Sequence, residues 1–133
     1  MTESEYIKSI RNEFAANEKA AAQVLERLED GLKFFPQSVE LWCLRGHLIL
    51  LSEGGDYELR DALDSYKKAV TLDPDCLDAI EEIGYFYDVI ERDPQSALPY
   101  FRKAVALGAR KKTRKALLDV IEQIQAKSVQ QNE

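Results

Sequence analysis

The sequence repeats itself at an offset of 35 residues, and this repetition constrains the fold more than any other feature. Residues 62–74 and 97–109 match in register: each has Ala-Leu, an aromatic residue four positions after the first Ala, a basic pair, Ala-Val, Leu and a helix breaker. A weaker copy precedes them and ends at Pro36, 38 residues before Pro74. Repeats of this length indicate stacked supersecondary units that bury their apolar faces against their neighbours.

Apolar positions within each unit recur at steps of three and four residues, which is the spacing of one helix face. No stretch alternates with a period of two, so we expect no strands. Ser38 and Asp75 are the expected N-caps of the helices that follow them, and residues 128–133 are expected to fray. The pattern predicts seven helices, at about residues 4–16, 19–34, 39–52, 57–72, 76–90, 96–107 and 111–127.

A glycine interrupts the apolar face of two of these expected helices. Gly46 and Gly84 each follow a large apolar residue by four positions and precede another by three. Glycine inside a helix costs about 1 kcal/mol relative to alanine, so these positions need a packing reason. We therefore expect a neighbouring helix to approach closely at each glycine.

These features resemble the tetratricopeptide repeat (TPR), whose signature is Trp-x2-Leu-Gly-x2-Tyr, then Ala-x3-Phe and a closing Pro over 34 residues. The third unit matches most of the signature but has Gly108-Ala109 in place of the closing Pro. Its matching residues are Ile80, Ile83, Gly84, Tyr87, Ala97 and Phe101.

The second unit matches with Trp42 and Gly46 but departs from the signature in three ways. Arg45 stands at the Leu position, Ile49 stands at the Tyr position, and about four extra residues fall between positions 53 and 61. The first unit keeps only its second half. Residues 93–108 are also similar to the Sel1-like repeat, a related family with longer units.

Both resemblances imply the same all-α architecture. It is a right-handed superhelix of about three helix-turn-helix hairpins plus a C-terminal capping helix, within a single TPR-like domain over residues 1–133. The hairpins are expected at about residues 4–36, 39–74 and 76–109, and the capping helix at about 111–127.

In TPR proteins the first helix of each hairpin lines a concave groove that binds peptides or partner helices. Carried over by position, the groove is acidic at one end, which favours a basic or amphipathic partner segment, and Tyr85 is a candidate anchor. The clamp of Lys and Asn that holds acidic C-terminal tails in this family is absent. The basic start of the last helix would partly occupy the groove if it folded against it. The candidate partner-binding residues are Glu40, Cys43, His47, Leu50, Asp78, Glu81, Tyr85 and Asp88.

Charge and composition exclude several other functions. Residues 1–108 carry 12 Lys/Arg and 21 Asp/Glu, and this acidic body argues against nucleic-acid binding, which needs a cationic face. The basic run 110–115 is interpreted as a solvated helix start. One histidine, His47, and the absence of nucleophile or phosphate-loop motifs argue against an enzyme. Asp73-Pro74-Asp75 lacks the loop length and central Gly of a calcium site.

The two cysteines, Cys43 and Cys76, are too few for a disulfide framework and are expected to be small buried residues. There is no secretory signal and no long apolar run, so we expect a cytoplasmic protein without membrane contact. We expect neither cofactor nor metal.

Three functions remain, and we give them in order of preference. The first is a protein-binding module of the adaptor, chaperone or inhibitor type, as a monomer or weak dimer. The second is a self-associating structural array, since the ends of a short solenoid can stack. The third is an enzyme or a nucleic-acid binder.

Overall fold

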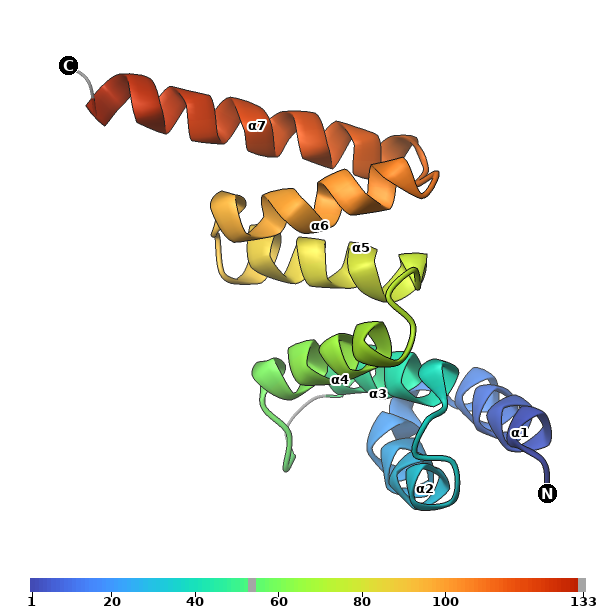
Figure 1. Cartoon of the computed structure of the whole chain (residues 1–133). Coiled ribbons are helices and arrows are strands. Elements are labelled where there is room, and N and C mark those ends of the chain that lie inside the picture. Colours follow the sequence, from blue (N-terminus) through green and yellow to red (C-terminus); the bar gives the residue numbers. More distant parts are fainter. Residues whose placement is uncertain (53–54, 132–133) are drawn as a thin grey trace. The chain divides into compact units, whose positions relative to one another are not determined.

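The computed structural model describes residues 1–52 and 55–131, which form two compact units, Met1–Pro74 and Asp75–Glu133. The described residues contain seven α-helices and no strand (Figure 1). The all-α helical-repeat class predicted from the sequence is confirmed. The single domain over the whole chain stays a prediction.

Unit 1 contains four helices, each of which packs on the next along the chain. They are α1 (Glu3–Ala16), α2 (Ala21–Phe34), α3 (Val39–Leu51) and α4 (Leu59–Leu72), with a 3-10 turn, η1 (Glu18–Ala20), before α2. Unit 2 contains α5 (Leu77–Tyr85), a π-helical turn, η2 (Phe86–Ile90), α6 (Pro94–Ala106) and α7 (Lys111–Gln131). In this unit α6 packs against both α5 and α7.

The close approach predicted at the two helical glycines is confirmed. The ring of Tyr66 on α4 lies against Gly46 on α3, where a Cβ atom would come within 2.6 Å of it. The ring of Phe101 on α6 lies against Gly84 on α5 in the same way, again at 2.6 Å. Tyr66 and Phe101 are both fully buried. Each hairpin is thus closed by an aromatic ring seated on a glycine that has no side chain to exclude it.

The first hairpin uses the same device with the two helices exchanged. Tyr6 on α1 supplies the ring, and Gly31 on α2 supplies the gap. The Tyr6 hydroxyl also donates a hydrogen bond to the carbonyl of Arg27. This hairpin therefore packs like the others although it lacks the first half of the repeat signature.

The helix starts agree with the sequence at one predicted cap and differ at another. The Ser38 hydroxyl accepts the Leu41 N–H at 3.2 Å and caps α3 as expected. Asp75 was wrongly predicted as a cap, because α5 begins one residue later and Cys76 occupies the N-cap position, where its side chain makes no capping hydrogen bond. The Asp75 carboxylate instead lies 3.8 Å from the Lys103 ammonium.

Helix α6 begins two residues earlier than expected. Asp93 caps it by accepting the Ser96 N–H at 3.1 Å, and hydrogen bonds from Ser96 lower the pKa of the Asp93 carboxyl. Pro94 occupies the first helical position, where its missing N–H costs nothing, and Pro99 consequently lies inside the helix.

Two helix ends also differ from the prediction. The segment expected as one helix over 76–90 changes at Phe86 into the π-turn η2, in which the Glu91 N–H donates to the Phe86 carbonyl at 3.0 Å. Arg92, with φ of 53°, then reverses the chain. The fraying expected from residue 128 is wrong as far as Gln131, where α7 ends, and residues 132–133 lie outside the described part.

Candidate functional site

Two of the candidate residues on α5 make hydrogen bonds to the first turn of α7. Thr113 is 1% exposed, and its hydroxyl lies 2.8 Å from the Tyr85 hydroxyl and also bonds to the Glu81 carboxylate. A carboxylate can only accept, so Thr113 donates its single proton to Glu81. Tyr85 must then donate to Thr113. The three side chains form a directed chain of hydrogen bonds that fixes the start of α7 against α5.

The Tyr85 ring is held between a cation and an aromatic ring. The Lys112 ammonium lies 5.2 Å from the centre of the Tyr85 ring, within the range of a cation–π interaction. The Phe101 ring meets Tyr85 edge-on, with centroids 5.0 Å apart and planes at 67°. The tyrosine is therefore fixed in orientation, and one of its neighbours is a solvent-exposed lysine.

A hollow of about 450 Å³ opens between these two helices. Its α5 side carries three carboxylates, and its α7 side carries two cations. Among the α5 residues that line it are four polar ones, which we call the α5 face: Asp78, Glu81, Glu82 and Tyr85. The opposite lining includes Arg110, Lys112 and Thr113. The basic start of the last helix thus folds against the third-unit candidates, as the sequence analysis considered.

Asp88, the remaining candidate of the third unit, does not line this hollow. It lies in η2 and is half-buried, and burial together with the negative charge of Asp119 raises the pKa of its carboxyl. A carboxyl whose pKa is raised by folding makes the native state less stable as pH rises through that range. Asp88 stays a predicted contact residue, but it lies outside the hollow.

The four candidates on α3 have different surroundings. Glu40 is exposed and lies 3.5 Å from Arg11 of α1, and Leu50 is half-buried. His47 is half-buried, with its Nδ1 atom 2.7 Å from the Tyr66 hydroxyl. Cys43 is 6% exposed, so it belongs to the core, as expected of a cysteine, and offers a partner almost no surface. Cys76 is half-buried, and the two cysteines are not joined in a disulfide.

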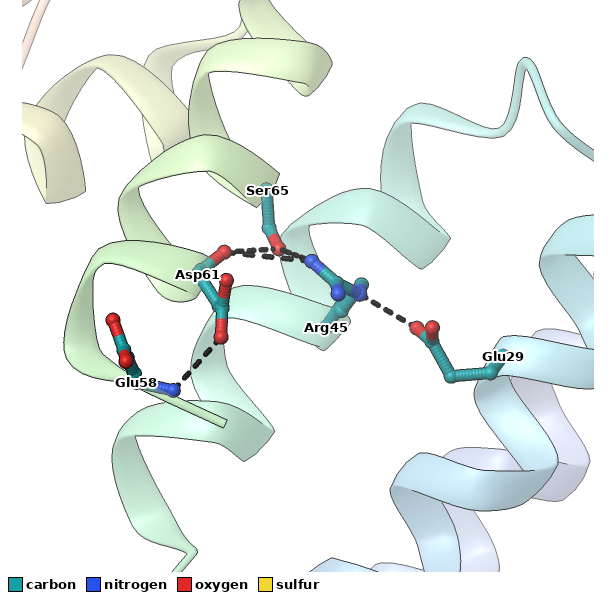
Figure 2. A network of polar contacts seen from close by, with 5 residues as sticks. All are labelled: Glu29, Arg45, Glu58, Asp61 and Ser65. Atoms are coloured by element: carbon teal, nitrogen blue, oxygen red, sulfur yellow. Dashed lines mark hydrogen bonds and ion pairs between the residues drawn. The ribbon is translucent and has the colours of Figure 1, made fainter. Parts of the chain in front are cut away.

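The sequence analysis noted Arg45 only as a departure from the repeat signature, but it joins three helices of unit 1 (Figure 2). Its Nε donates to Glu29 of α2 at 2.6 Å, and one terminal nitrogen donates to the Ser65 hydroxyl of α4 at 2.6 Å. Ser65 in turn donates to the carbonyl of Asp61 at 2.8 Å. The Arg45 side chain is only 16% exposed, and it occupies the position where the repeat signature has leucine.

The extra residues of the second unit complete the surroundings of Arg45. Tyr57, from this segment, lies 5.5 Å from the guanidinium, and Trp42 lies 5.8 Å away, both measured to the ring centre. Burial and the nearby Glu29 charge raise the pKa of Tyr57. The longer loop and the unusual arginine therefore form one feature. The two departures, taken together, were the signal in the sequence that could have revealed it.

Comparisons with known proteins were consistent with the geometry. No family model and no curated protein matches the sequence. The solved TPR domain of Sgt2 from Aspergillus fumigatus superposes with a TM-score of 0.74 at 17% identity, over 96% of this chain and 83% of that one. This chain has a TPR fold.

Two further TPR-like structures are similar to it. MamA gives a TM-score of 0.58 at 15% identity, over 92% of this chain and 88% of that one. The human IFIT1 dimer with PPP-AAAA gives 0.52 at 14% identity, over 99% of this chain and 41% of that one. The superpositions establish the fold, and identities this low establish nothing finer.

Two searches of the structure concern other site types. Within residues 1–52 and 55–131, no three His, Cys, Asp or Glu side chains gather in a way that could hold a metal ion. Over the same residues, no helix combines the length and the apolar character that crossing a membrane requires.

Proposed function

We propose that this chain is a non-catalytic protein–protein interaction module of the adaptor, chaperone or inhibitor type. Its α5 face would contact a basic or amphipathic segment of a partner protein. The observation that carries the proposal is the hollow of unit 2, where three carboxylates and an oriented tyrosine line one side. A TPR fold supports the general role, since proteins with this fold are interaction modules.

The chemistry of the α5 face suits a cationic segment. Asp78 is exposed, so its charge attracts basic residues from solution and accelerates their approach. Tyr85 offers a large, rigid surface with a polar end, the kind of side chain that dominates binding energy at protein interfaces. Glu40, His47 and Leu50 on α3 are proposed as secondary contacts. An acidic or phosphorylated partner is disfavoured because the hollow has three carboxylates against two cations, Arg110 and Lys112.

Reversing the charge of Asp78 is expected to abolish capture of the partner. Asp78→Lys places a cation where the partner's basic segment binds, and we expect the affinity to fall about tenfold or more, because close like charges cost over 1 kcal/mol. The measurement is affinity purification from native lysate at low and moderate salt, with quantitative mass spectrometry.

Glu122→Lys is the matched control, because it makes the same change in net charge as Asp78→Lys. Glu122 is exposed on α7 and lies outside the hollow. The wild type and the control should retain one protein that Asp78→Lys loses. Equal retention by all three baits contradicts the α5 face as the site. If no bait retains a protein, the exposed Leu118 and Val129 on α7 make self-association the better account.

A further inference from the structure

The α5 face is already occupied by a cation, and that cation belongs to the chain itself. The Lys112 ammonium lies over the Tyr85 ring at 5.2 Å, and the adjacent residue Thr113 bonds to Glu81 and Tyr85. A lysine over a tyrosine, in a hollow that is also lined by carboxylates, is what a basic partner segment would present to this surface. The first turn of α7 therefore makes the contacts expected of a ligand.

Lys112 can leave this position without disturbing the rest of α7. Its side chain is exposed, whereas the helix is anchored by Thr113 at 1% exposure and by Val120, which is fully buried. Val120 packs with Ala97 and Phe101 of α6, about two helical turns along α7 from Thr113. A rotation of the Lys112 side chain therefore uncovers the Tyr85 ring while the helix stays in place.

We propose that Lys112 is an internal ligand of the α5 face and that a lysine or arginine of the partner replaces its ammonium over Tyr85. This inference rests on the proposed function and adds the chemistry of the contact. Once Lys112 rotates away, the negative face of the Tyr85 ring and the Glu81 carboxylate remain, and both attract a cation. Lys112 then acts as a competitor that sets how basic a partner segment must be.

A direct contact between Lys112 and the partner would predict the opposite change in affinity when the lysine is removed. If the partner segment were acidic, Lys112 would be one of its contacts, and removing the lysine would weaken binding. If Lys112 competes with a basic segment, removing it strengthens binding. The direction in which one substitution changes the affinity therefore distinguishes the two roles.

The test uses the full-length protein and a synthetic capped peptide with the sequence Arg-Lys-Lys-Thr-Arg-Lys, which copies residues 110–115. By isothermal titration at low salt, Lys112→Gln is expected to raise the affinity for this peptide roughly fivefold, the effect of losing one cation–π competitor. Lys115→Gln removes the same charge from an exposed position outside the hollow and should change affinity less than about twofold.

Nuclear magnetic resonance of the wild type follows the displacement directly. The ε-CH2 protons of Lys112 should resonate upfield of other lysines because they lie over an aromatic ring. They should move to the ordinary lysine position as the peptide saturates the protein.

Equal effects of the two substitutions, a weaker complex with Lys112→Gln, or an unchanged Lys112 resonance at saturation would each overturn the inference. So would the absence of saturable binding by both the wild type and Lys112→Gln. Capture of a partner that depends on Asp78 would leave the proposed function standing in each of these cases. Loss of that dependence with a displaced Lys112 would instead contradict the proposed function alone.

Discussion

Phe101→Ala is expected to lower the free energy of unfolding by about 3–5 kcal/mol, the range for truncating a fully buried phenylalanine. The side chain is 0% exposed and fills the gap above Gly84, where alanine would leave a cavity. The substitution also removes the aromatic ring that contacts Tyr85 edge-on. The same ring packs against Val120 of α7, which loses this contact as well. Urea denaturation followed by circular dichroism measures the effect.

Phe34→Ala provides the matched control, because Phe34 is 77% exposed and its removal should change the free energy of unfolding by less than about 0.5 kcal/mol. A complementary substitution approaches the same contact from the other helix. Gly84→Val should destabilise by about 1–3 kcal/mol, since its Cβ would meet the Phe101 ring at 2.6 Å. Similar stabilities for Phe101→Ala and Phe34→Ala would refute the ring-on-glycine packing.

Arg45→Leu is expected to destabilise unit 1 by about 2 kcal/mol even though leucine is the residue of the repeat signature. The substitution takes the guanidinium from Glu29 and Ser65 and from the faces of Trp42 and Tyr57. Glu29 is partly exposed and can regain water, which keeps the loss below that of a fully buried ion pair. Chemical denaturation of the variant gives the free energy change.

The matched control is Arg11→Leu, which removes an exposed ion pair with Glu40 from the same unit. Its cost should stay below about 1 kcal/mol. A double-mutant cycle of Arg45→Leu with Glu29→Gln should show coupling, because the two side chains form one contact. If Arg45→Leu instead stabilises the protein, the signature leucine packs better there and the network of Figure 2 does not hold unit 1 together.

The repeats and their glycines were predictable because they depend on local periodicity. Gly46 and Gly84 occupy apolar helix faces, and a helix that gives up a side chain there must do so for a neighbour. The α5 start was harder, since Asp75 and Cys76 are adjacent and a one-residue shift decides which of them caps the helix. The roles of Arg45 and Lys112 were not predictable in detail, because they depend on which side chains of different helices meet.

Cys43 illustrates the same limit for the candidate site. Its position in the repeat pattern assigned it to the groove, but the packing of unit 1 buries it. Glu81 and Tyr85 were selected from position alone as well, and the structure adds their hydrogen bonds with Thr113. Sequence position thus selected a helix face, which stays a prediction as a binding site, and packing determined which of its residues remain exposed.

The central claim is that a partner protein binds at the α5 face, and site-specific photocrosslinking in the native cell tests it most directly. A benzophenone amino acid is placed at Arg110 in one variant and at Glu122 in another, both exposed positions of unit 2. Arg110 lines the hollow opposite the α5 face, so this probe leaves the three carboxylates in place. The account predicts one discrete adduct from position 110, weakened by Lys/Arg-rich competitor peptide, and none from position 122. An adduct from position 122 alone, or equal adducts from both positions, would contradict it.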